Sequence, residues 1–177
     1  MSYPGVVVVE YDPRWPARFD EERRRLQEAL GSWAIAIEHV GSTAVPGLGG
    51  KPIIDIMVGV RDLASAFADC SAALQSIGYL YVPRPLPDRH FFQRGPWGAR
   101  THHLHLTEFG GAMWERYLRF RDYLRAHPDM ARQYFEFKRQ VAARPGIDRP
   151  AYNAAKHPLI DGVVARLAGG LAPGGAQ

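Results

Sequence analysis

The sequence of 177 residues is poor in cysteine and in long apolar runs. Cys70 is its single cysteine, so the chain forms no disulfide within itself and no zinc site built on several thiolates. The apolar run at 6–9 is far too short to span a membrane or to form the core of a secretory signal. We therefore expect a cytoplasmic protein with no membrane partner.

Lysine is scarce as well. Of the 22 basic residues only Lys51, Lys138 and Lys156 are lysines, and the rest are arginines. A lysine in such a chain can mark a place where a compact ammonium group is needed, for example against a phosphate, and chance is the competing explanation. The net charge of +4 comes from basic residues spread along the chain between acidic ones, a distribution that does not favour a nucleic-acid partner.

The length and the hydrophobic content of 46% suit one domain, which we place at 1–168 before a flexible, glycine-rich tail at 169–177. The apolar periodicity, with its Gly and Pro breaks, predicts an α/β (α+β) fold with a small mixed β-sheet, flanking helices and a C-terminal helical half. The expected strands are 6–11, 35–40, 53–60, 79–82, 89–94 and 102–106, and the expected helices are 12–30, 62–77 and three more from 113 onward, with breaks at 127–128 and 144–146.

A loop rich in Gly, Pro, Ser and Thr joins the strands at 35–40 and 53–60. It begins with Gly41, Ser42 and Thr43, where a glycine permits a close approach or a positive φ and two hydroxyls can hold a phosphate. On their own these residues also fit a plain tight turn.

Asp55 lies in the middle of the second of these strands. A period of two places Asp55 and Met57 on one face and Ile54, Ile56 and Val58 on the other. A carboxylate among such neighbours is costly to bury unless a cation, a donor or a water-filled cleft meets it. A structural pair with Lys51 is one explanation, and we favour the other, a functional carboxylate.

A histidine cluster occupies the strand at 102–106. His103 and His105 share one face, and imidazoles two apart on a strand can bind one metal together with a further ligand such as Asp55. His102 shares the other face with the leucines. Histidines satisfied by hydrogen bonds are the alternative explanation, above all for His102.

Two tyrosine–lysine pairs lie one helical turn apart: Tyr134 with Lys138, and Tyr152 with Lys156. A tyrosine against a base and a lysine on a phosphate would explain both. The same spacing occurs in dehydrogenases, but no Gly-x-Gly-x-x-Gly follows a strand here, which argues against that function. Arg89 and Arg94, on the strand at 89–94, are further candidates for binding phosphate.

The stretch EHVGSTAVPGLGGKPIIDI (38–56) resembles the signature of the GrpB family, and the later stretches FRDYLRAHPDMARQYFEFK and YNAAKHPLI also resemble GrpB sequences. Members of that family resemble the nucleotidyltransferase superfamily in fold. The resemblance implies a Gly-Ser after one strand, an Asp-x-Asp on the next and a third carboxylate on a later strand, which together hold two Mg²⁺ ions and a nucleoside triphosphate. Gly41, Ser42 and Asp55 match this pattern. Met57 stands at the second carboxylate position, and His105 lies where the third should be.

These observations predict a protein that binds a nucleoside triphosphate with Mg²⁺ or Mn²⁺ and, if it is an enzyme, transfers a nucleotidyl or phosphoryl group to an acceptor. A catalytically silent nucleotide-binding module is the alternative, and a hydrolase with a His/Asp metal site is a third. We expect the Met57 sulfur to point into the same cleft as Asp55. The predicted catalytic residues are Asp55 and Ser42, the metal ligands are Asp55 with His103 or His105, and the nucleotide ligands are Gly41, Ser42, Thr43, Lys51, Arg89, Tyr134, Lys138, Tyr152 and Lys156.

Overall fold

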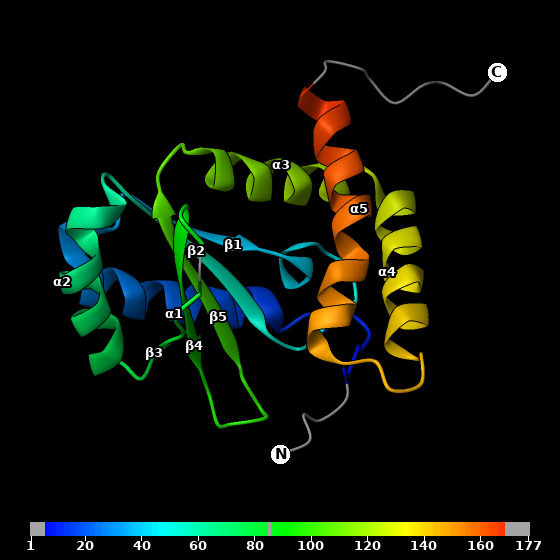
Figure 1. Cartoon of the computed structure of the whole chain (residues 1–177), viewed down its shortest axis with the longest axis horizontal. Coiled ribbons are helices and arrows are strands. Elements are labelled where there is room, and N and C mark those ends of the chain that lie inside the picture. Colours follow the sequence, from blue (N-terminus) through cyan, green and yellow to red (C-terminus); the bar gives the residue numbers. More distant parts are fainter. Residues whose placement is uncertain (1–5, 85, 169–177) are drawn as a thin grey trace.

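The computed structural model describes residues 6–84 and 86–168 and shows a five-stranded mixed sheet with helices around it (Figure 1). The predicted mixed α/β fold with a C-terminal helical half is confirmed, and the predicted tail at 169–177 lies outside the described residues. The strands are β1 (Ala36–Val40), β2 (Ile54–Val60), β3 (Leu80–Tyr81), β4 (Arg89–Arg94) and β5 (His102–Glu108), and the α-helices are α1 (Trp15–Leu30), α2 (Leu63–Ser76), α3 (Ala112–Ala126), α4 (Pro128–Ala142) and α5 (Arg149–Ala168).

The two strands that carry the predicted chemistry lie side by side in the sheet. The strand order is β1-β2-β5-β4-β3, and β2 pairs with β5 in parallel while the other neighbours are antiparallel. The register places Asp55 opposite His103 and Met57 opposite His105. Since paired residues share a face of the sheet, this pairing puts the carboxylate and both histidines on the same face.

The opposite face of the sheet is covered by α1 and α2. Their apolar residues pack with the alternate positions of β2 and β5, such as Ile56, Val58 and Leu104, in one core cluster. α2 begins as predicted, because the Asp62 carboxylate accepts a hydrogen bond from the Ser65 amide at 3.0 Å. In Figure 1, α2 lies at one end of the molecule, and α4 and α5 lie next to each other at the other end.

Met57 is not directed into a cleft, which corrects the prediction. It is fully buried and packs with Val40 of β1 and Trp114 of α3, the helix that covers this part of the sheet. A thioether fills such an irregular apolar gap well, and its place under an indole explains why the position is apolar. Met57 is therefore a core residue.

The predicted strand at 6–11 is wrong. Within the described residues of this segment, only Val9 forms a β-bridge, to Gly50 in the loop before β2, with both N–O distances at 2.9 Å. A strand needs a run of neighbours along a sheet edge, and Val9 meets a loop instead. α1 likewise begins at Trp15 rather than at 12, because the Asp12 carboxylate turns the chain by accepting from the Arg14 amide.

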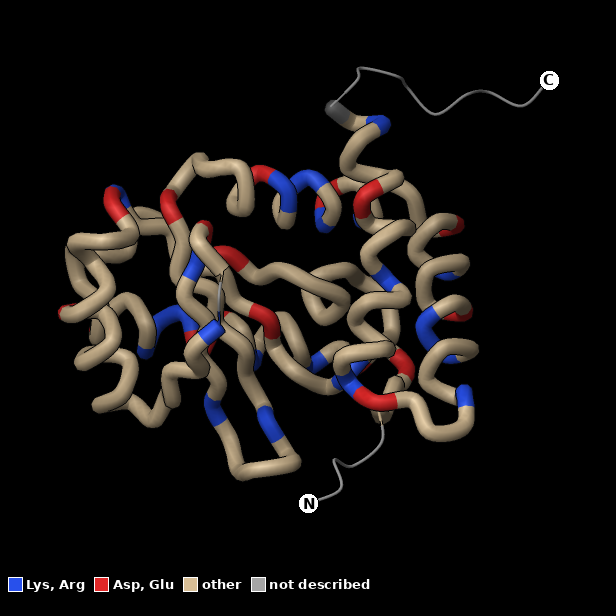
Figure 2. Tube along the Cα trace, in the orientation of Figure 1, with Lys and Arg blue, Asp and Glu red and all other residues tan. Residues whose placement is uncertain are grey.

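The C-terminal half consists of α3, α4 and α5, with the two predicted breaks between them. None of the helices in the described ranges is long and apolar enough to cross a membrane. Figure 2 shows basic positions over most of the trace but not on α2, with acidic positions between them.

A buried carboxylate fixes α1 to the far strands. Glu22 accepts a hydrogen bond from the Tyr79 hydroxyl at 2.9 Å and forms ion pairs with Arg94 at 2.8 Å and Arg25 at 3.1 Å. Burial raises the pKa of Glu22, while its hydroxyl and guanidinium partners act in the opposite direction. Arg94, one of the arginines predicted to bind phosphate, is thus engaged on the face covered by α1.

We expect Tyr79→Phe to lower the free energy of unfolding by about 1–3 kcal/mol, because a buried charged acceptor loses one of its donors. Tyr81→Phe is the matched control, since that hydroxyl is exposed and lies 3.3 Å from the His90 Nδ1; its effect should be close to zero. Urea unfolding of both variants measures the difference. Equal effects would show that the Tyr79 hydroxyl does not stabilise Glu22.

Candidate functional site

The site begins where β1 ends. Gly41 has φ +72°, and a Cβ built on it would lie 2.5 Å from the Asp55 Oδ2. A side chain at this position would be strained by the backbone conformation and would collide with the carboxylate. Glycine is thus required here because the backbone passes directly over Asp55.

Lys138 of α4 holds both ends of the loop between β1 and β2. Its ammonium group donates to the Ser42 hydroxyl at 2.8 Å and to the Gly49 carbonyl at 2.5 Å. The side chain is 1% exposed, and a Cβ on Gly50 would meet the Ser42 Cβ at 2.8 Å, so the loop is tightly packed around it. The position of the Ser42 hydroxyl is therefore set by a residue 96 positions along the chain.

Thr43 does not lie beside Ser42 in the site. Its hydroxyl bonds to the His39 Nε2 at 2.9 Å and donates to the Ile53 carbonyl at 3.4 Å, and the residue is 1% exposed. The short 3₁₀ turn of residues Ser42–Ala44 directs the two neighbouring hydroxyls to different surroundings. Thr43 is a core residue here, and we do not include it among ligand-binding groups.

Asp55 forms a pair with His103. The His103 Nδ1 lies 3.0 Å from the Asp55 Oδ1, with side-chain exposures of 14% for the histidine and 30% for the aspartate. Burial raises the pKa of Asp55, but the hydrogen bond from His103 and the surrounding positive charges outweigh it and bring the pKa to about 2. Asp55 is thus ionised at neutral pH and orients the imidazole ring.

Unpaired polar atoms gather on the same face of the sheet. Among the described residues, four buried side-chain atoms have no hydrogen-bond partner, and three of them are the Arg89 Nε, the His103 Nε2 and the His105 Nδ1. Buried polar atoms are normally paired, so three unpaired atoms on one face of the sheet make this face a candidate binding site. Burial, and then the charge of Arg89, lowers the pKa of His105 to about 3, so this ring is neutral at pH 7.

The three lysines of the chain converge here. Lys51 and Lys156 lie against the ring of Tyr152, with the Nζ atoms 5.4 and 4.7 Å from its centroid, and Lys138 lies 4.6 Å from that of Tyr134. Burial, and then repulsion between the lysines, lowers the pKa of Lys138 to about 7 and that of Lys156 to about 8. Both tyrosines are buried, and each packs under an ammonium group, so neither presents the open ring face predicted for a base.

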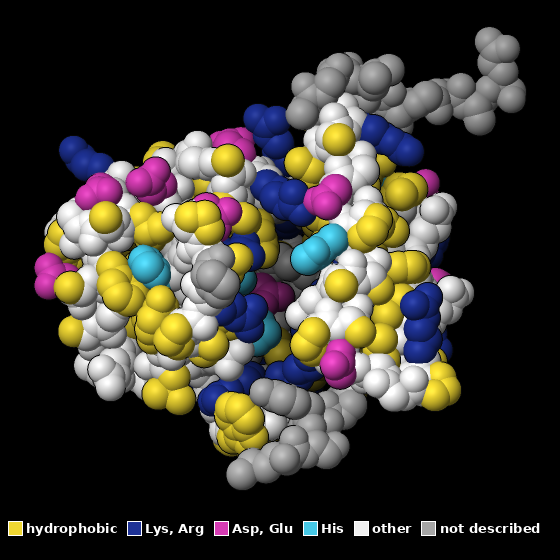
Figure 3. Space-filling view, viewed as in Figure 1, with side chains coloured by type: hydrophobic (Ala, Val, Ile, Leu, Met, Phe, Trp, Pro, Cys, Tyr) yellow, Lys and Arg dark blue, Asp and Glu magenta, His cyan; other side chains and the backbone are white. Residues whose placement is uncertain are grey.

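Three arginines add to this positive field, and the sequence patterns indicate only one of them, Arg89. Arg84 lies 4.2 Å from the centroid of the Phe91 ring, and Arg149 lies at the start of α5. The positive charges of both arginines lower the pKa of Lys51. The negative charge of Asp55 raises the pKa of all three lysines and so opposes this effect. Figure 3 shows a hollow in the middle of this face, where an acidic side chain lies deep among basic side chains and histidines.

The side chains present fit a divalent metal poorly. No group of three or more His, Cys, Asp or Glu side chains in the described ranges is placed to hold a metal ion. Asp55 already accepts from His103, and the second carboxylate position of the family pattern is the buried Met57. Mg²⁺ prefers six oxygen ligands and zinc four nitrogen, sulfur or oxygen ligands, and neither set is assembled here.

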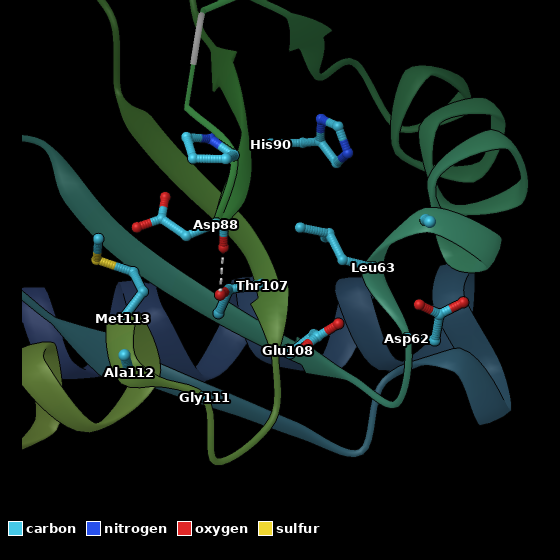
Figure 4. Close-up of a pocket in the computed structure, with 11 residues that line it drawn as sticks. Asp62, Leu63, Asp88, His90, Thr107, Glu108, Gly111, Ala112 and Met113 are labelled. Carbon is cyan, nitrogen blue, oxygen red and sulfur yellow. Dashed lines mark hydrogen bonds between the residues drawn. The ribbon is translucent and has the colours of Figure 1, made fainter.

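A separate cavity of about 310 Å³ lies between the start of α2 and the start of α3 (Figure 4). Its carboxylates are Asp62, Asp88 and Glu108, and no lysine or arginine lines it. Figure 4 shows the Thr107 hydroxyl bonded to the Asp88 carbonyl on one side of this cavity. The cavity is thus distinct from the positively charged hollow.

The family model described as GrpB protein matches residues 5–166. This chain belongs to the GrpB family. The crystal structure of conserved protein GrpB from Enterococcus faecalis superposes with a TM-score of 0.82 at 34% sequence identity, over 90% of this chain and 96% of that one. The predicted GrpB resemblance is therefore confirmed, and the fold is that of a solved GrpB structure.

Curated relatives extend beyond the matched region. UPF0157 protein PA4798 from Pseudomonas aeruginosa is 44% identical over 168 residues, and the match covers 93% of this chain and 66% of that protein. UPF0157 protein YqkA from Bacillus subtilis is 41% identical over 142 residues, and the match covers 78% of this chain and 40% of that protein. A dephospho-CoA kinase from Mycolicibacterium paratuberculosis is 32% identical over 178 residues, 86% of this chain and 44% of that protein. The chain thus spans less than two thirds of the length of each of these relatives.

The contact between Gly41 and Asp55 predicts a specific loss of stability. We expect Gly41→Ala to lower the free energy of unfolding by about 2–4 kcal/mol, from a positive φ and a collision with the carboxylate. Gly47→Ala is the matched control, because Gly47 has φ +76° and a Cβ built on it would meet no atom within 4 Å. We expect this control to lower the free energy of unfolding by about 1–2 kcal/mol, from the positive φ alone.

Denaturant unfolding of both variants, and of Gly41→Ala combined with Asp55→Ala, tests the cause. The second substitution removes the colliding carboxylate, so it should recover part of the loss caused by the first. If Gly41→Ala and Gly47→Ala cost the same, the close approach over Asp55 has no energetic role.

Proposed function

We propose that the positively charged hollow binds a nucleotide through its phosphate groups. The observation that carries this proposal is the convergence of Lys51, Lys138 and Lys156 around one ionised carboxylate. The unpaired buried donor Arg89 Nε lies on the same face of the sheet as that carboxylate. Positive groups confined in this way repel each other, and a phosphate relieves that repulsion. The family's resemblance to nucleotidyltransferases supports a nucleoside triphosphate as the ligand.

The exposure of each lysine side chain indicates which of them can contact the phosphate groups. Lys51 and Lys156 are partly exposed and form no ion pair or hydrogen bond with another described residue, so they are the groups that meet the phosphates. Ser42 is held by Lys138, whose pKa is lowered by the charges of Lys156 and Lys51. Lys138 itself is too deeply buried for direct contact and acts by fixing the loop and by its charge.

The site could also transfer a nucleotidyl or phosphoryl group from the bound nucleotide. The Asp55–His103 pair is the arrangement that orients an imidazole for proton transfer, and an enzyme would use it at the reacting oxygen. The buried Met57, in place of a second carboxylate, favours a binding module without turnover. Binding is common to both functions, so binding is the proposal.

The relatives named dephospho-CoA kinase add one ligand to consider. In the mycobacterial protein the matched region is less than half of the length, so its name does not assign an activity to this region. Dephospho-CoA carries an adenosine and a diphosphate, which are the chemical groups proposed here. It belongs in any ligand panel with ATP, GTP, CTP and UTP.

We expect at least one of these ligands to stabilise the protein. A ligand at about a hundred times its dissociation constant raises the free energy of unfolding by about 2.7 kcal/mol, which a thermal melt resolves. Lys156→Met should abolish most of the shift, whereas Arg132→Met, which removes an exposed charge on α4, should leave it unchanged. No shift with any of the five ligands, with or without Mg²⁺, would exclude the proposed function.

Asp55→Asn separates binding from turnover. The substitution keeps the size of the side chain and removes the one negative charge in the cluster, so nucleotide should bind at least as tightly as in the wild type. Any conversion of labelled nucleotide by the wild type should be lost, because His103 loses its orienting carboxylate. If nucleotide binds and neither protein converts it, the chain is a binding module, and unchanged conversion by Asp55→Asn would remove Asp55 from the mechanism.

A further inference from the structure

We infer that this site takes the metal-free form of a polyphosphate, with lysine ammonium groups neutralising the phosphate charge in place of divalent metal ions. The inference rests on the proposed function and names the charge state of its ligand. Four observations carry it: the sign of the field, the surroundings of Asp55, the missing metal ligands, and the unpaired donors.

The field in the hollow is positive. After burial, the charges of Lys156 and Lys51 lower the pKa of Lys138, the charge of Lys51 lowers that of Lys156, and the charges of Arg149 and Arg84 lower that of Lys51. Asp55 is the acid that opposes them. A divalent cation entering this region would be repelled by several positive charges and attracted by one carboxylate.

Both oxygens of that carboxylate have a close neighbour in the protein, although the side chain as a whole is 30% exposed. The Oδ1 accepts from the His103 Nδ1 at 3.0 Å. The Oδ2 faces the backbone of Gly41 so closely that a single added methyl group would stand 2.5 Å from it. A metal ion bound by Asp55 would compete with His103 for the Oδ1 and would meet the backbone of Gly41 beside the Oδ2.

The remaining groups do not complete a metal site. Met57 is 0% exposed and packs with Val40 and Trp114. The two unpaired ring nitrogens, on His103 and His105, are borderline ligands that suit zinc or nickel better than Mg²⁺. Two imidazoles without a free carboxylate do not match the oxygen cage that Mg²⁺ requires.

The unpaired groups match a polyanion. Lys51 and Lys156 form no ion pair or hydrogen bond with another described residue, and the buried Arg89 Nε has no acceptor. A free triphosphate brings several negative charges and many acceptor oxygens, whereas the magnesium complex has part of that charge already neutralised. The metal-free ligand therefore gains more from this site than the complex does.

Isothermal calorimetry tests the inference with ATP and with inorganic tripolyphosphate, each in excess EDTA and in excess Mg²⁺ or Mn²⁺. We expect affinity in EDTA to equal or exceed that in Mg²⁺, by up to about tenfold. Lys51→Met and Lys156→Met should each weaken binding in EDTA by about tenfold or more, while Arg132→Met, with the same change of charge on exposed α4, should alter it less than about twofold. Thermal melts of each unliganded variant show that it is folded.

The outcomes separate the inference from the proposed function. Binding that requires Mg²⁺ or Mn²⁺, or is more than about tenfold weaker in EDTA, overturns the inference and leaves nucleotide binding intact. Equal losses in Lys156→Met and Arg132→Met overturn it as well, because the attraction is then non-specific. No binding under any condition overturns both.

Discussion

The buried ammonium group of Lys138 is the interaction on which the site depends. Lys138 belongs to α4, and it joins the C-terminal helical half to Ser42 and Gly49 in the loop between β1 and β2. An ammonium group with 1% exposure is tolerated only because two oxygens accept from it and the ring of Tyr134 lies beneath it. This arrangement ties α4 to the loop between β1 and β2 at the edge of the hollow.

The same group makes the unliganded site electrostatically unfavourable at low pH. Burial and neighbouring lysines lower the pKa of Lys138 from its ordinary value of 10.5 to about 7, so the folded chain binds this proton less well than the unfolded chain does. Its contribution to stability is therefore missing below about pH 7 and grows as the pH rises from about 7 toward 10.5. A bound anion reverses the effect, because it favours the charged form. Ligand binding and lysine protonation thus support each other.

The five strands of the sheet were predictable from the sequence, whereas the strand expected at 6–11 was wrong. The pairing of β2 with β5 then accounts for the meeting of Asp55 with His103. Once Asp55 and His103 occupy neighbouring strands with alternating faces, period two alone brings them together. The burial of Met57 was not predictable in this way, because α3, which is distant in the sequence, covers it. The burial of Thr43 was not predictable either, because it depends on how the Ser42–Ala44 turn directs that side chain. The meeting of lysines from a loop, α4 and α5 likewise arises from long-range packing. Its sequence signals were the scarcity of lysine and, for Lys138 and Lys156, the spacing to a tyrosine one helical turn before. Arg84 and Arg149 had none, because arginine is common throughout this chain.

The proton uptake that accompanies ATP binding tests the central claim most directly, that crowded lysines form an anion site. Calorimetry at pH 8 in EDTA, in two buffers with different heats of ionisation, gives the number of protons bound with the ligand, whose phosphates are already ionised at that pH. The account predicts an uptake of about one proton, mainly on Lys138 and Lys156, and a smaller uptake in Lys156→Met. Binding without uptake, or with release of protons, would contradict it.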